Sequence, residues 1–203
     1  HEPAYNEDGF PKDRYIAYHL ERAKGGIAMT MSAGSAVVSK DSPPSFDNIH
    51  AYKDEVVPWI KKLTDTIHDH DCKIMIQLTH LGRRTSWSKG DWLPSISSGK
   101  HREPAHKAFP KVIESWDIER IIKEYGDAAE RMKQGGMDGV ELEGQGHLIG
   151  QFLSPLTNEL ITKYGGSLEN RLRFTLDVLS EIRKKVGQDF IVGIRCVFDE
   201  VEA

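Results

Sequence analysis

Apolar positions along the chain alternate between helical stripes and short uninterrupted runs. Spacings of three and four residues predict helices over 13–24, 55–70, 118–132 and 168–186. A compact apolar run without helical spacing follows each helix after a short link, and such a run is typical of a strand covered on both faces. The four runs are GIAMTM (26–31), KIMIQL (73–78), DGVEL (138–142) and FIVGIRC (190–196).

The connections between these elements differ in length. Strict alternation of helix and strand predicts a parallel sheet with right-handed crossovers, in either a doubly wound sheet or a barrel. The segments that follow the strands are long, whereas the links from a helix into its strand are only a few residues. Active-site loops of a (β/α)8 barrel all follow the strands, so this asymmetry favours an α/β fold of the TIM-barrel class.

Composition narrows the function classes. The chain has 203 residues, 38% of them hydrophobic and 29% charged, as expected for one ordinary globular domain. Its net charge of -4 is dispersed, so a nucleic-acid partner is not expected. Neither a membrane span nor a signal peptide is recognisable, which predicts no membrane partner and a cytoplasmic location. The two cysteines, Cys72 and Cys196, are far apart and adjoin apolar runs; we expect reduced core thiols and no metal site.

Two motifs resemble the old yellow enzyme family of FMN-binding barrels. In KIMIQLTHLGRR, the family's Gln-Leu pair and its His-x-Gly-Arg correspond to Gln77-Leu78 and to His80, Gly82 and Arg83. The second motif is QFLSPLTNELITKYGGSLENRLRF (151–174), and its residues 164–171 are expected to serve structure, with Ser167 as a helix cap.

The resemblance implies that residues 1–203 form a single partial FMN-binding barrel domain. This partial barrel would contain about strands 2 to 5 of the eight. Strand 1 would precede His1, and strands 6–8, with the phosphate-binding loops, would follow Ala203.

Within the family, the chain is most similar to the trimethylamine dehydrogenase and dimethylglycine or N-methylproline demethylase branch. The supporting segments are 1–26, 41–43 and 101–111. Membership would imply a small-molecule substrate, an N-methylated amine, with hydride transfer to the flavin. It would also imply a 4Fe-4S cluster and a further nucleotide in the part beyond Ala203, and it leaves a homo-oligomer open.

The resemblance implies three cofactor contacts. A flavin needs donors on its pyrimidine edge to stabilise negative charge in the reduced state; Gln77 can supply an amide and Arg195 a permanent positive charge. Ala33 is assigned to the same site. We expect Gln77 and Arg195 to converge on one rim. The structural alternative makes Gln77 a strand-end cap and Arg195 a salt-bridged core residue.

The catalytic candidates are Glu143 and His147. The family usually places a His-x-x-His or His-x-x-Asn pair here, or a tyrosine-histidine pair in the amine branch, but VELEGQGHLIG has glutamate first and is one residue shorter. A glutamate suits a cationic substrate through charge complementarity, and His147 would accept a proton. The alternative is a surface salt bridge. His80 and Arg83 would contact substrate or would brace their loop.

Two other functions remain open from the sequence. One is an ene-reductase of the old yellow enzyme type that uses NAD(P)H as its electron donor. The other is a truncated half barrel without catalysis that associates through its open strand edges. The sequence has no GxGxxG fingerprint that would indicate a Rossmann domain.

Overall fold

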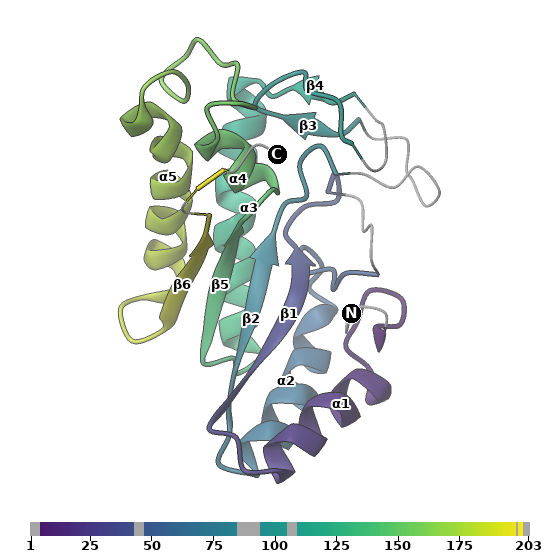
Figure 1. The fold of residues 1–203 in the computed structure, drawn as a ribbon. Helices are drawn as coiled ribbons and strands as arrows, with labels where there is room; N and C mark the ends of the chain where they lie inside the picture. Colours follow the sequence, from purple (N-terminus) through teal and green to yellow (C-terminus); the bar gives the residue numbers. More distant parts are fainter. Residues whose placement is uncertain (1–4, 43–46, 85–93, 105–108, 198, 201–203) are drawn as a thin grey trace.

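A four-stranded parallel sheet is the centre of the fold (Figure 1). The computed structural model describes residues 5–42, 47–84, 94–104, 109–197 and 199–200. The strands are β1 (Met29–Val37), β2 (Lys73–Thr79), β5 (Gly139–Gly144) and β6 (Ile191–Cys196), and they pair in that order. Because the spatial order follows the chain order, the sheet has no point at which the winding reverses, as a doubly wound sheet would.

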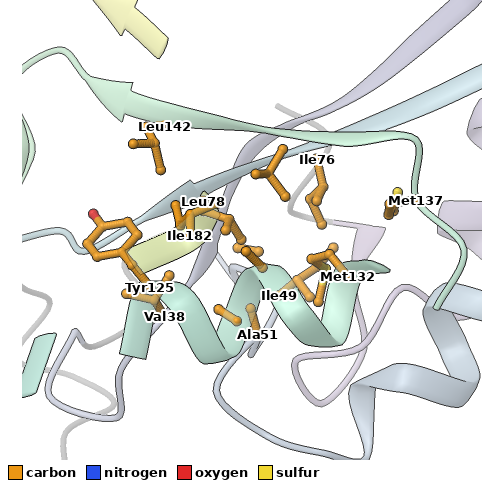
Figure 2. Packing of buried hydrophobic residues seen from close by; sticks show 14 of the residues in the cluster. Val38, Ile49, Ala51, Ile76, Leu78, Tyr125, Met132, Met137, Leu142 and Ile182 are labelled. Atoms are coloured by element: carbon orange, nitrogen blue, oxygen red, sulfur yellow. The ribbon is translucent and has the colours of Figure 1, made fainter. Parts of the chain in front are cut away.

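Four helices cover one face of this sheet (Figure 1). They are α1 (Asp13–Lys24), α2 (Val56–His68), α3 (Ser115–Gln134) and α5 (Leu168–Val186). On the covered face, Leu78 and Leu142 are fully buried against Tyr125 of α3 (Figure 2). On the other face, Met29 is 48% exposed and Ile191 is 50% exposed. Helices on one face only, with strands in chain order, make this a partial (β/α)8 barrel, as predicted.

The predicted helices and strands are present, and the differences are local. The run expected at 26–31 begins as a strand only at Met29 and continues to Val37, with a shift of register against β2 between Ser32 and Ala36. Three short elements were not predicted. They are β3 (Ile96–Ser97), β4 (Lys111–Val112) and α4 (Leu148–Leu153).

The segment before α5 is structural, as expected. Ser167 is the N-cap of α5, and its side chain accepts a hydrogen bond from the amide of Asn170. Arg171 donates from Nε to the carbonyl of Leu153 at 2.8 Å, and Tyr164 donates its hydroxyl proton to Asp177 at 3.0 Å. These bonds fix the end of α4 and the loop that follows it against α5.

The two cysteines differ in environment. Both are free thiols, but only Cys72 is buried, and Cys196 is exposed at the end of β6. The expectation of two core thiols is therefore wrong for Cys196 in this structure, because among the described strands β6 pairs with β5 alone. None of the helices in the described part of the chain is long and apolar enough to cross a membrane.

Candidate functional site

The candidate site lies on the uncovered face, at the carboxyl ends of β2, β5 and β6. Gln77 is in register with Glu141, and Glu143 is in register with Arg195. Paired residues of neighbouring strands face the same side of a sheet, and alternate residues of one strand share a side. The register therefore places all four side chains on the face opposite the helices.

Gln77 and Arg195 converge on a single carboxylate. Nε2 of Gln77 donates to Oε1 of Glu141 at 2.6 Å, and Nε of Arg195 donates to the same oxygen at 3.3 Å. The expected common rim is therefore present, whereas the role of these residues in holding a cofactor stays a prediction. Glu141 was not singled out in the sequence, although the alternation in VELEG gives it the same facing as Glu143.

Glu143 is a buried carboxylate at the end of β5. Glu143 is 8% exposed, and its Oε1 accepts a hydrogen bond from the amide of Gln145 at 2.6 Å. Burial raises the pKa of Glu143; the Gln145 amide and the charge of Arg195 oppose this shift, and the nearby Glu141 adds to it. Because Glu143 is buried, an exposed salt bridge does not describe its environment.

His147 is the N-cap residue of α4 and is 9% exposed. Nδ1 and the hydroxyl of Thr79 share a hydrogen bond of 2.8 Å. Burial lowers the pKa of His147 to about 4, and the charges of Arg84 and His80 contribute. His147 is thus neutral at pH 7, and Nε2 is the nitrogen it can offer to a ligand. Thr79 was missed in the sequence, where only its position two residues after Gln77 indicated the same facing.

His80 is fully buried, and both ring nitrogens have partners within the protein. Nε2 donates to Asp41 at 3.0 Å, and Nδ1 accepts from the amide of Gly82 at 3.1 Å. The amide of His80 donates to the Tyr125 hydroxyl at 2.8 Å. This arrangement favours the loop-bracing alternative over contact between His80 and a substrate.

Arg83 has a more open position. It lines a hollow of about 670 Å³ at the carboxyl ends of β5 and β6, together with Ser154, Cys196 and other residues of α4 and α5. Its Nη1 donates to the carbonyl of His101 at 3.5 Å, and burial lowers its pKa. A ligand can reach Arg83, so its substrate role stays a prediction. Ala33 lies in β1 where the register with β2 shifts, but its side chain is outside the described residues.

Gln151 ties the loop after β2 to the turn after β5. Its Oε1 accepts from the Arg83 amide at 3.2 Å and from Ser97 at 2.9 Å, and its Nε2 donates to the carbonyl of Gly146 at 3.1 Å. A weaker bond of 3.4 Å reaches the carbonyl of Leu81. The two loops that carry the candidate residues are therefore joined through one buried amide.

We expect Gly82→Ala to lower the free energy of unfolding by about 2 kcal/mol. Gly82 has φ 62°, and an added Cβ would lie 2.2 Å from Oε1 of Gln151. Urea unfolding of the complete protein measures this change. Gly26→Ala is the matched control, because Gly26 has φ 83° but an added Cβ meets no atom within 4 Å. If the free energy of unfolding fell equally in the two variants, the close contact with Gln151 would not be the cause.

The rim fits a flat, electron-accepting ring such as FMN. A permanent positive charge and an amide lie side by side at the carboxyl ends of parallel strands, where such barrels bind ligands. Among the described residues, no group of three or more His, Cys, Asp or Glu side chains could hold a metal ion.

Comparison with known proteins gives consistent similarities. The chain is 68% identical over 200 residues to a probable N-methylproline demethylase of Rhizobium meliloti (strain 1021), covering 98% of this chain and 30% of the relative. It is 47% identical to a multifunctional alkene reductase/demethylase OYE of Caballeronia cordobensis, covering 98% of this chain and 31% of the relative. The chain thus spans less than a third of the length of these curated relatives.

Solved structures agree on the fold. A structure of morphinone reductase in complex with tetrahydroNAD superposes with a TM-score of 0.88 at 25% identity, over 95% of this chain and 57% of that one. A complex of 2-naphthoyl-CoA reductase gives a TM-score of 0.85 at 29% identity, over 94% of this chain and 31% of that one. Residues 2–203 match one sequence family throughout, and the chain belongs to the NADH:flavin oxidoreductase / NADH oxidase family.

Proposed function

We propose that the complete protein is an FMN-dependent oxidoreductase that oxidises an N-methylated amine. The observation that carries the proposal is the charge of the rim. Two carboxylates, Glu141 and Glu143, lie on it beside Arg195, and the charge of Arg84 also acts on Glu143. Glu141 is paired with Arg195, so the carboxylate of Glu143 is the charge left for a cationic substrate. The name of the N-methylproline demethylase relative supports the same substrate class.

Gln77 and Arg195 would hold FMN by its polar edge, and FMN, when bound, supplies the hydride acceptor. Glu143 would bind the substrate nitrogen and orient its methyl group. The burial of Glu143 strengthens this attraction, because water screens it less. His147, neutral at pH 7, would accept at Nε2 the proton that the substrate ammonium must lose before its methyl group can give up a hydride, while Nδ1 donates to Thr79.

The 4Fe-4S cluster and the further nucleotide are part of this proposal only because the demethylase branch of the family implies them. An ene-reductase activity is the second candidate, since one relative is named both an alkene reductase and a demethylase. The two activities use opposite directions of electron flow, so one experiment separates them.

The test records the visible spectrum of the complete protein under anaerobic conditions. We expect an oxidised flavin that is bleached by N-methylproline or N,N-dimethylglycine without pyridine nucleotide. Proline and glycine are the matched controls, because they lack the methyl group. Absence of flavin would refute the proposal. Bleaching by NADPH alone, followed by reoxidation with an enone and no response to any amine, would establish the second candidate instead.

We expect Thr79→Val to lower kcat about tenfold while KM changes little. The valine removes the hydroxyl that fixes the ring and tautomer of His147 but keeps the side-chain volume, and a misdirected base loses part of the roughly 10²- to 10⁴-fold that general base catalysis contributes. Steady-state kinetics with an artificial electron acceptor measures this change. Thr66→Val on α2 is the control, because its hydroxyl donates to the exposed helix backbone at Lys62. An unchanged kcat in Thr79→Val would contradict a proton-accepting role of His147.

A further inference from the structure

The side chain of Glu141 has no obvious task in the stability of the sheet. Its side chain is 15% exposed, and Oε1 lies 3.3 Å from Nε of Arg195. Such a single-contact ion pair is weak evidence for stability, because the cost of removing the charges from water offsets their attraction. A carboxylate on the partly buried face of a strand also loses hydration. Its presence there therefore calls for another explanation.

Glu141 lies between the two residues that we assign to the cofactor edge. It is in register with Gln77 on β2 and with Gly193 on β6. Gly193 has no side chain, so Arg195, two residues further along β6, reaches back to Glu141 without an obstacle. One oxygen, Oε1, accepts from both neighbours.

This double contact has two physical effects. It fixes the direction of the Gln77 amide, because Nε2 is the atom turned toward Glu141. It also engages Nε of Arg195, so that an acceptor on the flavin would be bound by the two terminal nitrogens of the guanidinium. At the same time, the negative charge of Glu141 offsets the positive charge of Arg195 at short range.

We propose that Glu141 is a positioning residue that holds Gln77 and Arg195 at the cofactor edge and lowers the electron affinity of the bound flavin. The proposal rests on the proposed flavin site and adds to it the residue that sets its charge. A carboxylate beside a flavin disfavours the reduced, more negative state, whereas a lone arginine favours it. The pair together leaves a nearly neutral edge.

The test uses the complete, flavin-loaded protein and the variants Glu141→Gln and Glu141→Ala. We expect Glu141→Gln to stabilise the reduced flavin about tenfold relative to the oxidised flavin, which is a rise of about 30 mV in the two-electron midpoint potential. The glutamine oxygen can still accept the two hydrogen bonds, so flavin affinity stays near that of the wild type. Glu130→Gln on α3 is the control, because the Glu130 carboxylate pairs with Lys185 in the layer of helices. The midpoint potential of the flavin should not change in this variant.

Glu141→Ala removes the common acceptor as well as the charge. We expect FMN to bind about tenfold more weakly to this variant, as measured by fluorescence titration of the flavin-free protein, because Gln77 and Arg195 are no longer tethered. Circular dichroism and thermal melting verify that each variant is folded. If the alanine variant does not fold, the potential of the near-isosteric glutamine variant decides the matter.

An unchanged or lower midpoint potential in folded, flavin-loaded Glu141→Gln would overturn the proposal. Wild-type affinity for FMN in folded Glu141→Ala would overturn the positioning role. A wild-type protein that binds FMN but does not oxidise N-methyl amines would contradict the proposed substrate and would not alter either readout, so the two failures are distinguishable.

Discussion

Glu143→Gln is expected to lower kcat/KM for an N-methylated amine about 100-fold, equivalent to about 2.7 kcal/mol of transition-state stabilisation. The substitution keeps the shape of the side chain and its hydrogen bond from the Gln145 amide, but it removes the charge that would face the substrate cation. Losing one partner of a desolvated ion pair typically costs 2–5 kcal/mol. Steady-state kinetics of the complete protein, with an electron acceptor in excess, measures the change.

The pH dependence gives a second signature of Glu143. Burial raises its pKa, so protonation removes the carboxylate at a higher pH than for an exposed glutamate. We expect kcat/KM of the wild type to fall as the pH decreases through this raised pKa, and we expect Glu143→Gln to lack that fall. The pKa of His147, about 4, lies below the range into which burial raises the pKa of Glu143, so His147 does not cause this decline.

Two observations separate loss of charge from loss of structure. The variant must keep the flavin content of the wild type, as shown by its visible spectrum. Glu21→Gln on α1 is the matched control, because its carboxylate pairs with Lys24 in solvent and should leave kcat/KM unchanged. Activity of Glu143→Gln within threefold of the wild type would contradict a role for Glu143 in binding the cation.

Asp41→Ala is expected to lower the free energy of unfolding by about 4 kcal/mol. The Asp41 carboxylate accepts from His80 at 3.0 Å and from Ser39, and it pairs with Arg120 of α3. Its removal leaves a buried imidazole N–H without its acceptor and takes one carboxylate from Arg120, which keeps its bonds to Glu124. Urea unfolding of the complete protein measures the loss. Asp65→Ala, whose carboxylate pairs with Lys61 in solvent, should cost less than about 1 kcal/mol.

The contacts of Asp41 also predict that the fold loses stability as the pH falls. Burial alone would raise the pKa of Asp41, but the hydrogen bonds from His80, Ser39 and Arg120 outweigh it and hold the pKa well below its usual range. A lowered pKa in the folded state stabilises the fold above the unfolded pKa of about 4, and this contribution is lost as the pH falls further. The difference in the free energy of unfolding between the wild type and Asp41→Ala should therefore become smaller below pH ~4. If this difference stayed constant down to pH ~2, the stabilisation would not come from the ionised Asp41 carboxylate.

The sequence predicted the sheet and its helices because both carry strong periodic signals. Buried stripes such as Val56, Ile60, Leu63 and Ile67 on α2 repeat over several turns. The elements that were missed are too short to have a period: β3 and β4 have two residues each, and α4 has six. They form through loop contacts, such as the bonds of Ser97 and Ser98 to Gln151, that no local pattern reveals.

The site was predicted less completely than the fold. Motifs identified Gln77 and Arg195, and alternation within a strand could have added Glu141 and Thr79, whose facing is fixed by parity. His80 follows the last residue of β2, where alternation no longer constrains the side chain. Its partner Asp41 is far away in the sequence, so only the folded chain distinguishes bracing from substrate contact.

The buried amide of Gln151 has a consequence for how the site would meet its substrate. Because it bonds to both loops, and because the Leu148 amide also donates to the carbonyl of His80 at 2.9 Å, these segments cannot move apart without breaking several hydrogen bonds at once. A site built in this way is preorganised. Selectivity would then be set before the substrate arrives, and amide hydrogen exchange in the two loops should change little when an amine binds.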